Sequence, residues 1–178
     1  GQTVDVWAYS NCDEVELFLN GTSQGRKSRS DKELNMVWRL PFDEGSLLAV
    51  GYRDGSEVMR QEVKSAGEPA AIVLTPDRRE IKADGSDLSF ITVTVVDSEN
   101  VPVPHADNLV TFTVEGAATI AGVDNGCQTS MEPFRADYRR AFNGKCLLVV
   151  KAGKEEGSVM VTAAAEGMTP AVTEIRVR

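Results

Sequence analysis

The sequence contains few of the residues that build most hydrolytic and metal centres. Its 178 residues include one histidine, His105, so a Ser-His-Asp triad or a histidine-rich metal site would depend on that single side chain. The three cysteines, an odd number, lack the paired C-x-x-C spacing of a zinc site. Histidine-dependent hydrolysis and metal chemistry are therefore disfavoured, and we expect no metal and no cofactor.

Positive charge and long apolar runs are also scarce. The 19 Lys and Arg residues against 27 Asp and Glu residues give a net charge of −8, which repels phosphate backbones and anionic lipid surfaces. Apolar stretches such as residues 146–150 fall far short of the roughly 20 residues that a membrane-spanning helix needs. We therefore expect no nucleic-acid partner and no membrane span.

What is present is alternation of apolar and polar residues with a period of two, whereas no window of 11 or more residues carries a sustained helical stripe. The pattern predicts strands in the first third of the chain whose apolar faces are Val4, Val6 and Ala8; Val15, Leu17 and Leu19; Leu34, Met36, Trp38 and Leu40; and Leu48, Val50 and Tyr52. Asn20-Gly21 and Asp54-Gly55 tolerate positive φ angles and predict hairpin turns. Gly1 leads directly into the first strand without a signal peptide, so we expect a piece of a longer chain.

A change of composition marks a domain boundary at Lys64–Pro69, where small and turn-forming residues leave little to bury, and we expect limited proteolysis to begin there. Beyond it the apolar faces of further strands are Ile72 and Leu74; Leu88–Val96; Val110, Phe112 and Val114; Leu148 and Val150; Val159 and Val161; and Ile175 and Val177. We predict an all-β protein of two tandem immunoglobulin-like antiparallel β-sandwich domains, residues 1–66 and 67–178.

One polar, irregular stretch breaks this rhythm, Gly122–Gly144, and loops of that length are uncommon unless they are functional or disordered. It mixes apolar rings with arginines, as surfaces that meet a partner do, and its interface candidates are Phe134, Tyr138, Arg139 and Phe142. The alternative is a loop that folds back on its own sandwich and fills gaps at its edge.

Acidic residues could in principle form a catalytic pair or a calcium site. The candidates for a carboxylate pair are Asp84, Asp124, Glu132 and Asp137, and those for calcium are Asp97-Ser98-Glu99-Asn100 and Asp124-Asn125. Because these residues lie in turns or on polar strand faces, solvated surface and Asx turns explain them better. We therefore assign no catalytic residue and no metal ligand. Asn20-Gly21-Thr22 matches a glycosylation acceptor, although the hairpin explains it better.

Exposed aromatic rings would offer a sugar-binding platform, since a ring stacks on the C–H face of a pyranose. The candidates are Trp7, Trp38, Tyr52 and Tyr138. Trp38 shares an apolar face with Met36 and Leu40 and is expected in the core, whereas Trp7 could line either face.

Several strings resemble known sequences. Val15-Glu16-Leu17-Phe18-Leu19-Asn20-Gly21 resembles the small β domain that follows the catalytic barrel in bacterial β-galactosidase-like enzymes of glycoside hydrolase family 2. The strings Ala66–Pro69, Ile72–Thr75, Ile81–Leu88, Ala121–Gly126 and Ala141–Gly144 resemble the C-terminal immunoglobulin-like domain of the same enzymes. Single strings of this kind also occur in invasin-type bacterial repeats, but the tandem is specific to the enzymes.

The resemblance implies a non-catalytic C-terminal scaffold region of a secreted or periplasmic retaining glycoside hydrolase, because the catalytic glutamates of the family lie on a (β/α)₈ barrel that no string here matches. The implied partners are that barrel, the other domains of the enzyme and, as an option, a second copy in a homo-oligomer. A carbohydrate-binding module and an adhesin-type immunoglobulin array remain alternatives. In an oxidising compartment Cys127 and Cys146 could pair, which would leave Cys12 single; the other possibility is three reduced thiols.

Overall fold

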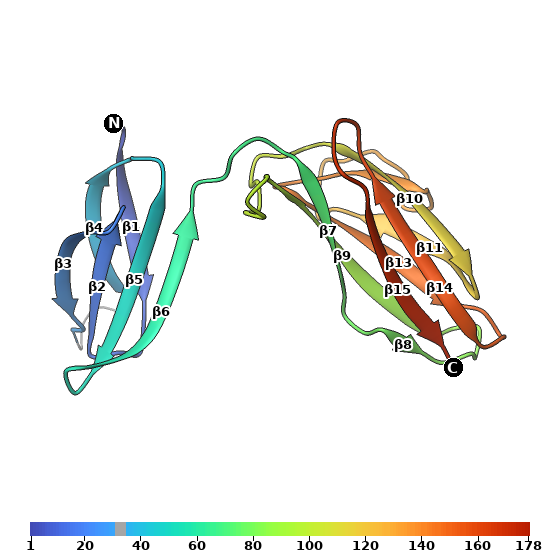
Figure 1. The fold of residues 1–178 in the computed structure, drawn as a ribbon, viewed down its shortest axis with the longest axis horizontal. Coiled ribbons are helices and arrows are strands. Elements are labelled where there is room, and N and C mark those ends of the chain that lie inside the picture. Colours follow the sequence, from blue (N-terminus) through green and yellow to red (C-terminus); the bar gives the residue numbers. More distant parts are fainter. Residues whose placement is uncertain (31–34) are drawn as a thin grey trace. The chain divides into compact units, whose positions relative to one another are not determined.

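The computed structural model describes residues 1–30 and 35–178, and all the regular structure in this part of the chain is β-strand (Figure 1). The prediction of an all-β protein is confirmed. The strands form two compact units, the first unit Gly1–Ser65 and the second unit Ala66–Arg178. In the described residues no helix is long and apolar enough to cross a membrane.

The first unit, coloured blue to cyan, is a small sandwich of two unequal sheets (Figure 1). The smaller sheet pairs β1 (Thr3–Tyr9) with β4 (Asn35–Pro41) in an antiparallel register. The larger sheet has the order β3-β2-β5-β6, with β2 (Glu14–Leu19), β3 (Thr22–Ser28), β5 (Ser46–Arg53) and β6 (Ser56–Lys64).

Both predicted hairpins form in the first unit. Asn20 and Gly21 join β2 to β3 with φ angles of 50° and 77°, and Asp54 and Gly55 join β5 to β6 with 50° and 76°. Two successive positive φ angles are what a type I′ turn requires. The Asn20 side chain is also engaged, since its Nδ2 donates to the Glu44 main-chain oxygen at 2.9 Å and its Oδ1 accepts from the Ser46 amide at 2.8 Å.

The core of the first unit lies between its two sheets. Val15 and Leu17 of β2 pack with Met36 and Trp38 of β4, and Val6, Ala8, Leu40, Leu47 and Ala49 surround them. Trp38 is 2% exposed, and its indole Nε1 donates a 3.1 Å hydrogen bond to the Gly25 oxygen, so its predicted place in the core is confirmed. Leu34, predicted on the same face, lies outside the described residues.

The predicted inward face of β5 is wrong. Leu47 and Ala49 contact the core in place of Leu48, Val50 and Tyr52. The physical reason is that β5 carries apolar residues on both faces, so periodicity alone does not choose between them. Val50 is nevertheless buried, because it lies on the outer face between its cross-strand partners Glu16 and Arg60.

The second unit, coloured green to red, packs a five-stranded sheet on a four-stranded sheet (Figure 1). The first has the order β12-β10-β14-β15-β8, with β12 (Tyr138–Arg140), β10 (Leu109–Gly116), β14 (Gly157–Ala164), β15 (Ala171–Val177) and β8 (Glu80–Ile81). The second has the order β11-β13-β9-β7, with β11 (Ala118–Asp124), β13 (Lys145–Ala152), β9 (Leu88–Val96) and β7 (Ala71–Pro76). The predicted antiparallel pairing fails at one edge, because the short β8 pairs with β15 in parallel.

The core of the second unit is built from the residues that the alternation pattern predicted. Ile91, Leu148, Val159 and Ile175 are all 0% exposed, and they come from both sheets. A smaller cluster of Val95, Val103, Ala106 and Ala141 lies beside this core, with Ala66 packed against it.

The predicted linker Lys64–Pro69 is held more firmly than its composition suggests. Ser65 donates its amide to the Gly45 oxygen at 2.8 Å within the first unit. In the second unit the Gly67 amide donates to Asp97 Oδ2 at 2.7 Å, and Ala70 donates to the Val96 oxygen at 2.9 Å. Preferential proteolysis at this segment stays a prediction.

Candidate functional surfaces

The irregular stretch predicted over Gly122–Gly144 is shorter in the structure. Its beginning belongs to β11 and Tyr138–Arg140 form β12, which leaves residues 125–137 as the loop. Val123 donates its amide to the Phe134 oxygen at 2.8 Å, and the Phe112 amide donates to the Asp137 oxygen at 2.7 Å. These bonds tie the loop to its own sandwich.

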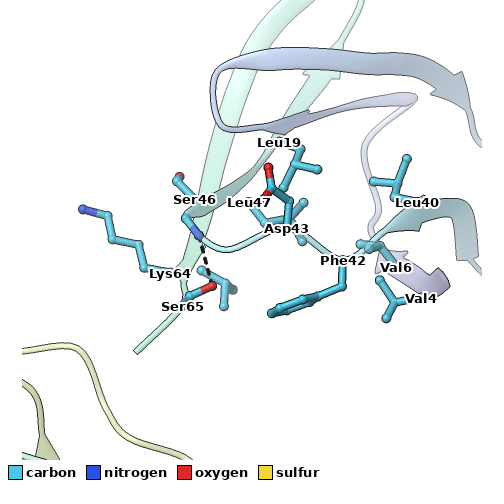
Figure 2. A pocket seen from close by; sticks show the side chains of 12 residues that line it. Val4, Val6, Leu19, Leu40, Phe42, Asp43, Ser46, Leu47, Lys64 and Ser65 are labelled. Carbon is cyan, nitrogen blue, oxygen red and sulfur yellow. Dashed lines mark hydrogen bonds between the residues drawn. The ribbon is translucent and has the colours of Figure 1, made fainter. Parts of the chain in front are cut away.

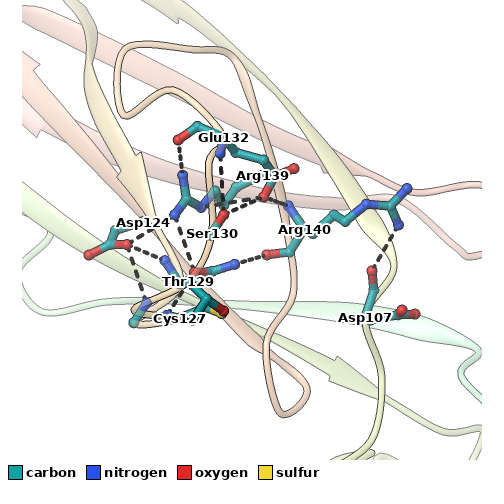
Figure 3. Close-up of polar contacts among 10 residues, drawn as sticks. Asp107, Asp124, Cys127, Thr129, Ser130, Glu132, Arg139 and Arg140 are labelled. Atoms are coloured by element: carbon teal, nitrogen blue, oxygen red, sulfur yellow. Dashed lines mark hydrogen bonds and ion pairs between the residues drawn. The ribbon is translucent and has the colours of Figure 1, made fainter.

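Arg139 is buried beneath this loop and is not a surface residue. Figure 3 shows its polar contacts with Glu132 and Asp124. Its side chain is 1% exposed, Nη1 donates to the Glu132 oxygen at 2.9 Å, and Nη2 donates to Asp124 Oδ1 at 3.3 Å and Asn125 Oδ1 at 3.2 Å. Its Nε lies 3.7 Å from Glu132 Oε2 as an ion pair. The prediction that Arg139 meets a partner is therefore wrong, because β12 places its side chain inward, where it satisfies the oxygens of the loop.

The turn that precedes the loop shows how the acidic residues are used. Asp124 Oδ1 accepts from the amides of Asn125 and Gly126 at 2.7 and 3.2 Å, and Asn125 Oδ1 accepts from the Cys127 amide at 3.0 Å. Oxygens engaged in this way with backbone donors form an Asx turn. Within the described ranges no group of three or more His, Cys, Asp or Glu side chains is arranged to hold a metal ion.

Other acidic candidates are also turn-forming. Asp84 Oδ1 accepts from the Ser86 amide, the Asp87 amide and the Ser86 hydroxyl at 2.7 to 2.9 Å, and these bonds hold the pKa of Asp84 below its usual value. Amides from Gly67 and Val101 likewise lower the pKa of Asp97. A carboxyl group whose anion is stabilised in this way is a poor general acid near neutral pH.

Three of the four interface candidates stay at the surface. Phe134 is 63% exposed, Phe142 is 43% and Tyr138 is 36%. The Arg139 guanidinium lies 5.3 Å from the centre of the Phe134 ring, a cation–π contact. The Phe134 ring is therefore contacted by Arg139 while most of its surface stays exposed to solvent. Their role as interface residues stays a prediction.

The three cysteines are free thiols, so the hypothetical bridge between Cys127 and Cys146 is not formed. Cys146 points into the core from β13, and burial raises the pKa of its thiol to about 12. Cys127 lies in the loop with its sulfur 3.5 Å from the Thr129 hydroxyl, and this bond lowers the pKa of its thiol. His105 is exposed in a turn, as expected.

An apolar groove in the first unit escaped the sequence reasoning. Its floor is Leu47 and Ala49 of β5, one wall is Val6 of β1, and the other wall is Met59 and Val63 of β6. The groove comprises two pockets of about 240 and 360 Å³, which share the lining residues Val6, Leu47 and Val63. Figure 2 shows the first pocket, where Val4, Val6 and Leu40 of the smaller sheet approach Leu19 and Leu47 of the larger one. The signal in the sequence was weak, since β6 carries only Met59 and Val63 as apolar residues on the face that lines the groove. Among the described residues no strand of the smaller sheet covers them.

Two rings stand out from the other face of β1. Trp7 and Tyr9 are 54% and 70% exposed, and their ring centroids lie 6.4 Å apart at an interplanar angle of 29°. Asp5, on the same face, forms an ion pair of 2.8 Å with Arg39 of β4. The alternative that Trp7 lines the outside of its sheet is confirmed.

Comparisons with known proteins fit this architecture. Residues 72–174 match the glycoside hydrolase family 2 C-terminal domain 5, and residues 1–59 match a domain of unknown function, DUF4982. Beta-galactosidase BoGH2A of Bacteroides ovatus is 47% identical over 98% of this chain, and a putative beta-glucuronidase of Formosa agariphila is 30% identical over 93%. This chain corresponds to 21% and 16% of the length of those two relatives.

Solved structures agree with the sequence matches. A glycosyl hydrolase family 2 member from Bacteroides cellulosilyticus superposes on all of this chain with a TM-score of 0.94 at 44% identity, and the match covers 23% of that protein. A beta-glycosidase from Bacteroides vulgatus gives a TM-score of 0.95 at 31% identity. Since the family model covers more than half of the sequence, the chain belongs to the C-terminal domains of glycoside hydrolase family 2.

Proposed function

We propose that this chain is a non-catalytic scaffold region of a β-galactosidase-like retaining glycoside hydrolase that works in the periplasm or outside the cell. The observation that carries the proposal is the match of residues 72–174 to a C-terminal domain of family 2, in a chain that corresponds to only 21% and 16% of the length of two relatives. Retaining hydrolysis needs two carboxyl groups about 5 Å apart that flank the scissile bond. The carboxylates described above instead accept hydrogen bonds from the amides of their own turns, and Asp124 and Glu132 contact Arg139.

The proposal is tested by separating the two parts of the enzyme. The 178-residue chain, assayed alone on aryl galactosides, glucuronides and mannosides, is expected to give no turnover. Deletion of the same residues from the full-length enzyme is expected to lower its stability or its assembly. Turnover by the isolated chain that survives repurification, and that is lost on mutation of one of its own carboxylates, would contradict the scaffold role.

A carbohydrate-binding role is the second candidate, and the Trp7–Tyr9 pair is the observation that favours it. Two exposed, nearly parallel rings beside Asp5 and Arg39 combine stacking surfaces with hydrogen-bonding groups. Affinity electrophoresis in gels that contain polysaccharides tests this role. Retardation of the chain that Trp7→Ala abolishes would support it, and unretarded migration in every gel would reject it.

A further inference from the structure

The two sheets of the first unit do not match in width. The Trp38 indole donates to the Gly25 oxygen, and Lys27 Nζ donates to the Val37 oxygen at 2.5 Å, so β4 lies over β3. From β1 of the same sheet, Val6 and Ala8 pack against the core side chains of β2 and β5. The position next to β1, over β6, is empty among the described residues, and the groove lies there.

Several apolar side chains that border this position are poorly covered. Met59 and Val63 of β6 are 53% and 61% exposed, although they pair with Gly51 and Leu47 and so point to the core side of the sheet. Phe42, which follows β4, is 51% exposed in the same groove. An apolar surface of this extent on the inner side of a sandwich indicates a missing layer.

β1 presents an unpaired backbone edge to the same position. The Phe42 amide donates to the Gln2 oxygen, one residue beyond the Thr3–Pro41 pair of the β1–β4 register, so Gln2 and Phe42 continue the ladder as a hydrogen-bonded pair. Because hydrogen-bonded pairs alternate along an antiparallel ladder, Val4, Val6 and Ala8 bond to β4. The amides and carbonyls of Asp5, Trp7 and Tyr9 therefore point away from β4, toward the groove side.

This edge lacks the protection that sheet edges usually carry. β1 pairs with β4 through seven residues without a bulge, and it contains no Pro, Lys or Arg. The outer strands of the larger sheet differ, since β3 and β6 each pair across a register shift and carry Lys or Arg residues. Regular edges that lack a bulge, Pro and Lys invite strand pairing, and natural proteins blunt or cover them.

We infer that an extended segment of the same polypeptide, outside these 178 residues, adds a strand to the free edge of β1 and places alternate apolar side chains in the groove. This inference rests on the proposed function, in which the chain is part of a longer enzyme, as it is in relatives where it corresponds to about a fifth of the length. A tethered segment binds at a high effective concentration, which a single strand requires. The added strand turns the two-stranded sheet into a three-stranded one that covers β6.

Amide hydrogen exchange on the full-length enzyme tests the pairing directly. The amides of Asp5, Trp7 and Tyr9 are expected to exchange at least about 100-fold more slowly than exposed amides. The amides of Val6 and Ala8, which bond to β4, are the reference for this protection. A lysine in the groove should remove this protection. A docked strand would bury the lysine's charge, which is unfavourable, so the strand would not dock. Val63→Lys is expected to accelerate exchange at the three edge amides at least about tenfold. Val58→Lys is the matched control, a half-exposed valine of β6 that does not line the groove, and should leave exchange unchanged.

Each other outcome overturns the inference. Rapid exchange at the edge amides in an enzyme that retains its activity excludes the added strand and leaves the scaffold role intact. Protection that depends on protein concentration identifies a second copy as the occupant. A third outcome is free exchange at the edge amides together with destabilisation by Val63→Lys but not by Val58→Lys. This result would identify docking of side chains in the groove without strand pairing.

Discussion

Arg139 donates a 2.9 Å hydrogen bond from Nη1 to the main-chain oxygen of Glu132, seven residues earlier, and this bond joins the far side of the loop to strand β12. The same guanidinium reaches Asp124 and Asn125 at the point where β11 ends. One buried cation therefore ties the beginning and the middle of residues 125–137 to β12. Ordering a loop of this length costs conformational entropy, and these hydrogen bonds offset part of that cost.

Arg139→Ala is expected to destabilise the second unit by roughly 3 kcal/mol, because it removes a buried side chain together with its hydrogen bonds to Glu132, Asp124 and Asn125. Urea denaturation of the chain, followed by circular dichroism, measures the change. The neighbouring Arg140→Ala is the matched control, since the Arg140 side chain is exposed and donates a long hydrogen bond to the Asp107 oxygen at 3.3 Å. Its cost should stay within about 0.5 kcal/mol. Equal effects of the two substitutions would show that Arg139 does not hold the loop.

Tyr138→Ala tests the remaining interface hypothesis separately from loop stability. Tyr138 is 36% exposed on β12, so its removal should change the melting temperature of the chain little. If the surface around Phe134 and Tyr138 meets another part of the enzyme, the same substitution lowers the stability or activity of the full-length protein. Unchanged full-length behaviour beside a strongly destabilised chain would assign Tyr138 to self-packing.

Tryptophan fluorescence should report the first unit alone, because Trp7 and Trp38 are the two tryptophans of the sequence. Trp38→Ala removes a side chain that is 2% exposed and should cost about 3–5 kcal/mol in the first unit. Trp7→Ala, at 54% exposure, serves as the control and should cost far less. In Trp7→Phe the remaining emission is expected to be blue-shifted and to shift red when the first unit unfolds.

The cysteines should differ sharply in reactivity. Thiol titration of the unfolded, unreduced chain is expected to find all three free. In the folded chain Cys127 should react first, because its partly exposed thiol has a lowered pKa, whereas the buried Cys146, with a pKa of about 12, should resist until unfolding. Cys127→Ser should remove the fast phase. A fast phase that persists in Cys127→Ser would contradict this assignment.

The second unit should lose stability in acid through Asp97. Hydrogen bonds from the Gly67 and Val101 amides lower the pKa of its carboxyl in the folded chain below the ordinary value of 3.8. A lowered folded-state pKa gives stability that is complete above the unfolded pKa and is lost as the pH falls through the folded value. In a series from pH 7 to pH 3, the melting temperature should therefore decrease once the pH is below about 4. Asp97→Asn should lower the melting temperature at pH 7 and flatten this dependence, and an unchanged slope would contradict the role.

The sequence by itself determined the strand pattern, the hairpin turns and most of the core of the second unit. Asn20-Gly21 and Asp54-Gly55 tolerate the positive φ angles that their turns require, and this is a local property. In β10 the apolar residues Val110, Phe112 and Val114 alternate with polar residues, which left one possible buried face. Such features depend on neighbouring residues along the chain, which is why they were predictable.

Tertiary structure alone decided three other features. β5 is apolar on both faces, so its inward side was set by its pairing with β2. Arg139 was predicted at the surface, because its burial depends on oxygens of Asp124, Asn125 and Glu132 that only the folded loop brings together. The groove beside β1 exists because the two sheets of the first unit differ in width, and the number of strands that one sheet places over another is a property of long-range packing, which local sequence does not encode.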